Sequence, residues 1–178
     1  MLLNSKNKTL LLRNLKISDL KLYFEIMQDK ETKKGFMTTP NTIQEAKKEL
    51  QELISETKKK NPKNISLAII YENNFAGYVG CYVRNKKPFT EKGVEAAIVY
   101  SIHPNFRGKN IATNAVKLLV NYIFKTYKIK RISGRCRTFN KASARVLEKA
   151  GFKLEGIHRK EAYKDGKYLD NMIWAIVK

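Results

Sequence analysis

Residues 102–113 read Ile102-His103-Pro104-Asn105-Phe106-Arg107-Gly108-Lys109-Asn110-Ile111-Ala112-Thr113. An apolar, β-branched run precedes this stretch, and apolar residues at helical spacing follow it. The order predicts a strand, a basic loop with one glycine, and a helix. The first turn of such a helix has unpaired amide N–H groups and a partial positive charge, so the junction suits an anion. Arg107 and Lys109 add mobile charge that favours a pyrophosphate.

The spacing Arg107-x-x-Asn110-x-Ala112 resembles the acetyl-coenzyme A (acetyl-CoA) loop of the GNAT acetyltransferases, whose pattern is Gln/Arg-x-x-Gly-x-Gly/Ala. Asn110 stands where the middle glycine is usual. Asparagine reaches left-handed backbone angles at low cost and keeps its N–H, so the exchange is tolerable. A strand, loop and helix with one glycine also occurs in many other α/β proteins, so further segments of the sequence are needed to decide whether the resemblance holds.

Length and composition favour one ordinary domain spanning residues 1–178, with 43% hydrophobic residues. The sequence shows neither an apolar run of about 18 residues nor a signal-peptide pattern, so we expect a soluble, cytoplasmic protein without a membrane partner. With 36 Lys and Arg against 16 Asp and Glu, the net charge is +20. This charge favours a polyanionic partner, either a phosphorylated co-substrate or RNA, although lysines spread over a solvated surface explain it equally well.

The cysteines and histidines give no pattern for a metal site. Cys81 and Cys136 lack C-x-x-C spacing, and His103 and His158 are also isolated. We therefore expect two buried, reduced thiols and no metal.

Periodicity predicts an α/β domain with a mixed, twisted sheet of about seven strands and helices on both faces. The strands cover residues 9–13, 65–71, 75–84, 93–102, 129–138, 153–159 and 169–177. The helices cover residues 18–28 and 42–58, a segment after Asn110, and a segment that Asn140 caps and Gly151 ends. Residues 30–40 are expected to be irregular and 86–92 to form a loop. Gly77 and Gly80 mark a bulge or a close approach of two backbones.

A second motif extends the resemblance to the whole chain. Asn140-x-x-Ser143, followed by a helix ending in Lys149-x-Gly151-Phe152, is similar to the second GNAT signature, in particular that of the RimJ/RimL branch of amino-terminal acetyltransferases. Leu12-Arg13, Leu154-Glu155-Gly156 and Tyr163-x-x-Gly166-x-x-x-Asp170 also match this branch. The resemblance implies the GNAT (acyl-CoA N-acyltransferase) fold and an acyltransferase with acetyl-CoA as co-substrate.

The resemblance also implies where acetyl-CoA binds. The amides around 108–113 would hold the pyrophosphate, and the strand end at Ile102 would pair with the pantetheine arm, splayed from the 132–138 strand. Asn140 would contact the pantetheine region, and Lys141 and Arg145 would reach the adenosine phosphates unless they are ordinary helix-surface cations. The implied binding residues are Ile102, Arg107, Gly108, Lys109, Asn110, Ile111, Ala112, Thr113, Asn140, Lys141, Ser143 and Arg145.

The implied reaction is attack of an amine on the thioester, through a tetrahedral intermediate that expels a thiolate. Ser143 is the candidate that protonates the thiolate, or else merely a capping hydroxyl, and Tyr100 and Tyr163 are weaker candidates. The identity of the general base is undecided, because Ala97 stands where the family often has Glu. Glu95, two residues earlier on the same strand face, would act through a water.

The missing base bears on the acceptor. An α-amine has a pKa near 8 and is substantially neutral at pH 7.5, whereas neutralising a lysine-like amine there costs roughly 4 kcal/mol. Polyamines and aminoglycosides would also need a carboxylate cluster, and the sequence shows no more than the Glu91 and Glu95 pair. We therefore rank the N-terminus of a protein or peptide first, with a ribosomal protein and work near the ribosome compatible with the basic charge. A small-molecule amine (polyamine or antibiotic) and a catalytically silent GNAT-shaped binding module are the alternatives, and the oligomeric state stays open.

Overall fold

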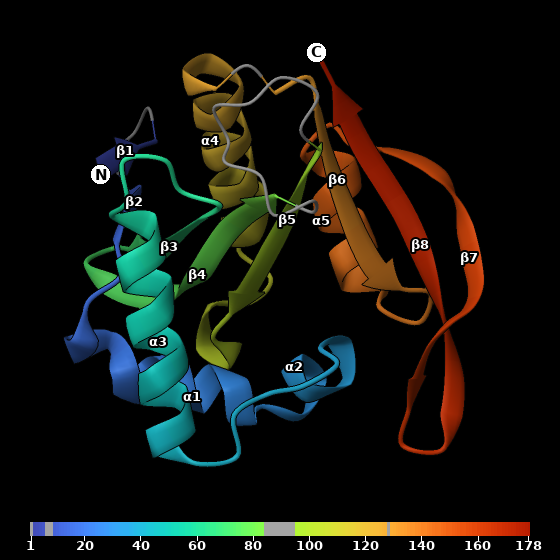
Figure 1. The fold of residues 1–178 in the computed structure, drawn as a ribbon, viewed down its shortest axis with the longest axis horizontal. Coiled ribbons are helices and arrows are strands. Elements are labelled where there is room, and N and C mark those ends of the chain that lie inside the picture. Colours follow the sequence, from blue (N-terminus) through green and yellow to red (C-terminus); the bar gives the residue numbers. More distant parts are fainter. Residues whose placement is uncertain (1, 6–8, 84–94, 128) are drawn as a thin grey trace.

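A computed structural model describes residues 2–5, 9–83, 95–127 and 129–178 as one mixed sheet with helices on both faces (Figure 1). The strands are β1 (Leu2–Asn4), β2 (Leu10–Asn14), β3 (Asn64–Tyr71), β4 (Asn74–Val83), β5 (Glu95–Ile102), β6 (Arg131–Arg137), β7 (Lys153–Lys164) and β8 (Lys167–Val177). The α-helices are α1 (Leu20–Gln28), α2 (Lys30–Gly35), α3 (Ile43–Thr57), α4 (Ile111–Thr126) and α5 (Lys141–Lys149). The strand order across the sheet is β1-β2-β3-β4-β5-β6-β8-β7.

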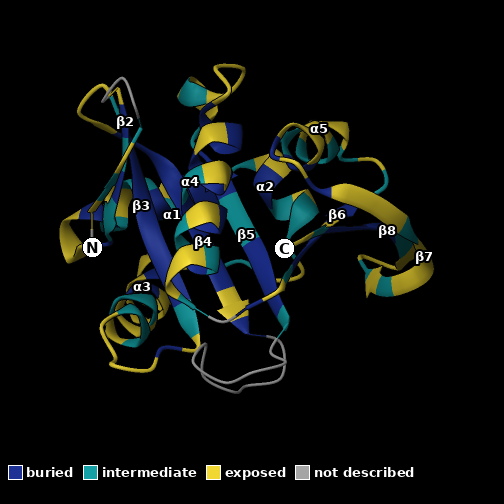
Figure 2. Cartoon of the chain, turned by 90° about the horizontal axis from the view of Figure 1, so that it is seen from above, coloured by how far each residue is buried: buried dark blue, intermediate teal, exposed yellow. Residues whose placement is uncertain are grey.

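The central strands are hydrophobic on both faces because helices cover both (Figure 2). On β3, Ile65, Leu67 and Ile69 belong to the core beneath α4, which continues to α5. The intervening Ala68 and Ile70 belong to a second core with α1 and α3. The alternation follows from the two-residue period of a strand, and it explains why this segment is an almost unbroken apolar run.

The sheet opens in its middle, between β5 and β6. Every other neighbouring pair is antiparallel, whereas β5 and β6 are parallel and their register extends from Glu95 opposite Arg131 to Ala97 opposite Ser133. Beyond Ala97 the two strands diverge, as Figure 1 shows. The predicted splay of these strands is therefore present, and it leaves one side of the second half of β5 open.

The fold class is as predicted, with corrections in detail. Within the described residues the sheet has eight strands, because the short β1, which was not predicted, pairs with β2. Residues 30–40 are partly helical, since α2 occupies their first half. The last hairpin is longer than expected, with β7 continuing to Lys164 and β8 beginning at Lys167. The predicted loop at 86–92 lies outside the described residues.

Cys81 and Cys136 are buried and free, as the sequence predicted. Burial raises the pKa of each thiol, so both stay protonated at neutral pH. Within the described ranges, no helix is long and apolar enough to cross a membrane.

Gly77 lies where β4 comes closest to the end of β5, which confirms the predicted close approach. It is paired with Ile102 and has φ 154°, next to an irregularity in the register with β3. A Cβ at this position would stand 2.2 Å from the carbonyl oxygen of Ser101. This glycine therefore sets the path of the strand end that borders the cavity described below.

We predict that Gly77→Ala lowers the free energy of unfolding by about 2 kcal/mol or more, because strand backbone has to move to relieve the clash. Gly156→Ala is the matched control, since a Cβ there meets nothing within 4 Å. Chemical denaturation of both variants measures the difference. Equal stability of the two would contradict this account of Gly77.

Candidate active site

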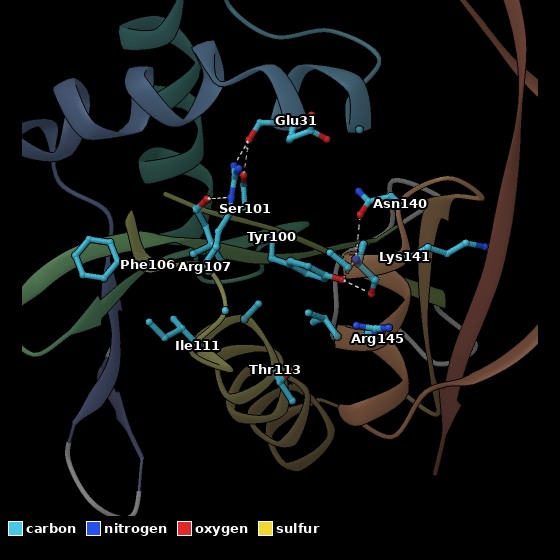
Figure 3. A pocket seen from close by; sticks show the side chains of 18 of the residues that line it. Glu31, Tyr100, Ser101, Phe106, Arg107, Ile111, Thr113, Asn140, Lys141 and Arg145 are labelled. Atoms are coloured by element: carbon cyan, nitrogen blue, oxygen red, sulfur yellow. Dashed lines mark hydrogen bonds between the residues drawn. The ribbon is translucent and has the colours of Figure 1, made fainter. Parts of the chain in front are cut away.

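A cavity of about 620 Å³ lies beside the end of β5, beyond the point where β5 leaves β6. Its walls come from the end of β5, the loop into α4, the first turns of α4 and α5, and α2 (Figure 3). The lining residues are Glu31, Thr32, Gly35, Phe36, Tyr100, Ser101, Ile102, Phe106, Arg107, Gly108, Asn110, Ile111, Ala112, Thr113, Phe139, Asn140, Lys141, Ala142, Ser143, Arg145, Val146 and Lys149. Apart from Lys109, the structure thus brings together every residue predicted to bind acetyl-CoA.

The start of α4 is shaped to receive an anion. Asn110 precedes the helix with φ 57° and ψ 14°, the left-handed conformation that the motif requires at this place. Gly108 also has a positive φ of 80°. The Asn110 side chain does not cap the helix, so the first amides of α4 keep their hydrogen-bonding capacity for a ligand.

Three cations extend the positive character of this wall along α5. Lys141, Arg145 and Lys149 line the cavity and are exposed. In Figure 3, Arg145 lies on α5 and Lys141 extends outward. Lys109 does not join them, because its Nζ lies 5.8 Å from the ring centre of Phe106 and 6.0 Å from that of Tyr71. A phosphate-rich ligand would therefore meet backbone amides and α5 cations together.

Asn140, Ser143 and Tyr100 form a hydrogen-bonded group at the middle of the cavity (Figure 3). Asn140 Oδ1 accepts from the Ser143 amide at 3.0 Å, which confirms the predicted cap of α5. The Tyr100 hydroxyl lies 2.8 Å from Ser143 Oγ and also donates to the Ser143 carbonyl at 3.1 Å. Burial raises the pKa of Tyr100, an effect that outweighs its hydrogen bond with Ser143, so the phenol keeps its proton.

The structure does not bring Glu95 or Tyr163 to this cavity. Glu95 lies at the start of β5, about 16 Å of strand before Tyr100, and is paired with Arg131 at 3.6 Å. Tyr163 lies on the outer hairpin, 59% exposed, with its ring centre 5.0 Å from that of Tyr168. Neither residue is among those that line the cavity.

The helix α2 was not predicted, and together with its C-cap it supplies Glu31, Thr32, Gly35 and Phe36 to the cavity wall. The signal was present as Asp29-x-x-Thr32, because an Asp three residues before a helical amide is a common N-cap. In the structure Asp29 accepts from the Thr32 amide at 2.9 Å. The helix is too short for apolar periodicity to reveal it.

The sequence pattern of the Acetyltransferase (GNAT) domain family matches residues 9–153. The chain belongs to this family. It is 43% identical over 82 residues to YjcK of Bacillus subtilis (strain 168), a probable N-acetyltransferase, across 46% of this chain and 45% of that protein. It is 30% identical over 77 residues to the [ribosomal protein uS5]-alanine N-acetyltransferase of Escherichia coli (strain K12), across 43% of this chain and 40% of that protein.

Solved structures agree with this membership. RimL, a ribosomal L7/L12 α-N-protein acetyltransferase solved in complex with coenzyme A, superposes with a TM-score of 0.82 at 22% identity, covering 99% of this chain and 98% of RimL. The fold is thus the GNAT fold, and relatives of the predicted RimJ/RimL branch are among the similar proteins. The chain carries an acetyl-CoA-dependent N-acetyltransferase domain.

The cavity of this GNAT domain fits acetyl-CoA. The open amides at the start of α4 suit the pyrophosphate, and the exposed cations of α5 suit further phosphate. The unpaired side of β5 beyond Ala97 offers backbone groups to an extended chain such as pantetheine.

We predict that Asn110→Gly changes the dissociation constant for acetyl-CoA by less than about two-fold, because Asn110 already has the backbone conformation of the family glycine. Asn110→Val should weaken binding by about five-fold or more, since a β-branched residue is strained at a positive φ. Calorimetric titration measures both constants. A large gain in affinity for Asn110→Gly would mean instead that Asn110 weakens the loop.

Proposed function

We propose that this N-acetyltransferase acetylates the α-amine at the N-terminus of a protein or peptide, with ribosomal proteins as the first class of acceptor to test. The observation that carries the proposal is the charge of the cavity wall. Among the described residues that line it, Glu31 is the sole carboxylate, against four cations. Such a site accommodates one ammonium group and offers no cluster of acids for several.

This charge pattern argues against polyamines and aminoglycosides. Each carries several ammonium groups, which an exposed cationic wall repels unless carboxylates compensate. Glu31 is itself exposed and paired with Lys34 at 2.6 Å. A peptide N-terminus brings a single positive charge to the site and does not meet this penalty.

Among the described residues that line the cavity, Glu31 is the sole carboxylate and is paired with Lys34, so no dedicated base is placed there, which favours the same acceptor. An α-amine is substantially neutral near pH 7.5, so a weak base or bulk water suffices to remove its proton. A lysine-like amine would need a dedicated base, and Glu95 is not near the cavity. The names of the relatives support this choice, because one acts on an alanine of ribosomal protein uS5 and RimL acts on L7/L12.

Acetyl-CoA supplies an acetyl group activated as a thioester. In our proposal the end of β5 aligns the donor, Asn140 and the first turn of α5 hold its thiol end, and Ser143 with Tyr100 supplies a proton to the departing sulfur. Because Tyr100 donates to the Ser143 carbonyl, the Ser143 hydroxyl is free to donate to the phenol oxygen or to the substrate.

Release of free thiol from acetyl-CoA tests the acceptor class. We expect turnover with short peptides that have a free N-terminal Ala or Ser, and turnover lower by about ten-fold or more with spermidine and kanamycin. A peptide with a blocked N-terminus and an internal lysine is the matched control and should be inactive. Turnover of that peptide, or of spermidine above the free peptides, would overturn the proposal.

We predict that Tyr100→Phe lowers kcat by about ten-fold to a hundred-fold while the dissociation constant for acetyl-CoA stays within about two-fold. An unchanged kcat for Tyr100→Phe would remove this hydroxyl from the mechanism.

For the wild type, kcat/KM should rise with pH to a plateau with an apparent pKa near that of the peptide amine, about 8. Because burial raises the pKa of Tyr100, we expect no falling limb in this pH profile below about pH 10.

A further inference from the structure

The helix α2 forms a wall of the cavity but has little apolar packing of its own. It is six residues long, with the sequence Lys-Glu-Thr-Lys-Lys-Gly, and buries one of them, Thr32. Isolated helices of this length are unstable in water. Polar contacts to other elements must therefore hold α2 in place.

The first of these contacts involves Arg107, directly before the anion-binding loop. Its guanidinium does not face the amides of 108–113 but turns to Asp29, with Nη2 2.5 Å from Oδ2 and Nη1 3.4 Å from Oδ1. The same side chain donates from Nε to the carbonyl of Ile102 at 3.2 Å. Partial burial raises the pKa of Asp29, but hydrogen bonds from Arg107 and Thr32 outweigh it and hold that pKa below its usual range.

Thr32 extends this contact to β5. Its hydroxyl is buried and lies 3.0 Å from Asp29 Oδ2, 3.3 Å from Arg107 Nη2 and 3.3 Å from the hydroxyl of Ser101. Ser101 follows Tyr100, whose hydroxyl meets Ser143. The start of α2 is therefore joined to the strand end that carries the proposed proton donor.

A second contact holds the other end of α2. Lys164, on the outer hairpin, donates from Nζ to the carbonyl oxygens of Lys33 and, at 2.6 Å, of Phe36. A cation at these carbonyls satisfies the unpaired acceptors of a helix C-terminus and interacts favourably with its dipole. Opposite charges thus complement both ends of α2, with Asp29 at the start and Lys164 at the end.

We propose that Asp29, Arg107 and Lys164 are positioning residues that fix α2 as the acceptor-side wall of the active site. The assignment of this wall to the acceptor rests on the proposed function, and the clamping of α2 does not. Figure 3 places Tyr100 between α2 on one side and the first turn of α4 on the other. Phosphates of acetyl-CoA belong to the α4 and α5 side, which leaves α2 to face the incoming amine.

Arg107 also joins the two substrate sites. It holds Asp29 through its guanidinium while its own backbone leads directly into the loop 108–113. Ordering of that loop by bound acetyl-CoA reduces the freedom of Arg107 and hence of α2. Acetyl-CoA should therefore slow amide exchange in α2, although it does not have to touch that helix.

Amide hydrogen exchange of residues 29–36 tests the clamps without any acceptor. We compare Asp29→Asn, which keeps a capping side chain but removes the charge, with Arg107→Met and Lys164→Met, which keep much of the apolar stem. Each is expected to speed exchange of α2 by about five-fold. Glu155→Gln is the matched control, because it breaks another two-contact arginine pair, with Arg131, remote from the cavity.

Steady-state kinetics then test the role of the wall. In Asp29→Asn and Lys164→Met we expect KM for the peptide to rise by about five-fold or more, with kcat changed by less than about two-fold. In Arg107→Met the dissociation constant for acetyl-CoA should rise as well, because Arg107 also fastens the loop 108–113 to Ile102. If Asp29 and Arg107 act as one unit, KM for the peptide in the double variant Asp29→Asn/Arg107→Met should not exceed that of the single variant with the higher KM.

The outcomes separate the inference from the proposed function. Unchanged exchange of α2 in all three variants would overturn the clamps, whatever the enzyme acetylates. Faster exchange with unchanged peptide KM would show that α2 is clamped but is not the acceptor wall. Absence of turnover by the wild type with every peptide would instead count against the proposed function, and the exchange result would stand.

Discussion

The rest of the structure depends on the divergence of β5 from β6 after Ala97. In a sheet without this divergence, the backbone N–H and C=O groups of β5 would be hydrogen-bonded to the strands on both sides and would not be available to a ligand. The divergence leaves the second half of β5 without a strand partner on the β6 side, inside the domain and with packing on both faces. Gly77 supports that edge from β4, because the absence of a side chain there lets the end of β5 lie close.

Electrostatics divides the cavity that results. The wall built by α4 and α5 combines helix amides with Lys141, Arg145 and Lys149, and it matches the phosphates of acetyl-CoA. The opposite wall, α2, brings one carboxylate, Glu31, to the cavity, and Asp29 and Lys164 complement the two ends of this helix. The net charge of +20 therefore does not by itself imply RNA, because in our proposals part of it binds the co-substrate and part of it holds a helix.

The sequence was sufficient for the features that depend on local chemistry. Asn140 as a helix cap, Asn110 as a left-handed residue and the close approach at Gly77 each follow from what one residue type does well. It was insufficient where partners far along the chain decide. Periodicity places Glu95 on the same strand face as Ala97, but Glu95 lies at the start of β5, away from the residues that line the cavity. The position of α2 depends on contacts with Arg107 and Lys164, which its own sequence does not reveal.

The position of Arg107 suggests why the family motif accepts either glutamine or arginine there. A residue selected to bind phosphate would be arginine or lysine, because charge supplies most of that interaction. Glutamine and arginine share a different property, a planar N–H donor on a stem long enough to reach a nearby carbonyl. Arg107 uses its Nε in this way on Ile102, at the last residue of β5. In this chain Arg107 therefore fastens the loop to the strand through Nε, and its terminal guanidinium nitrogens contact Asp29.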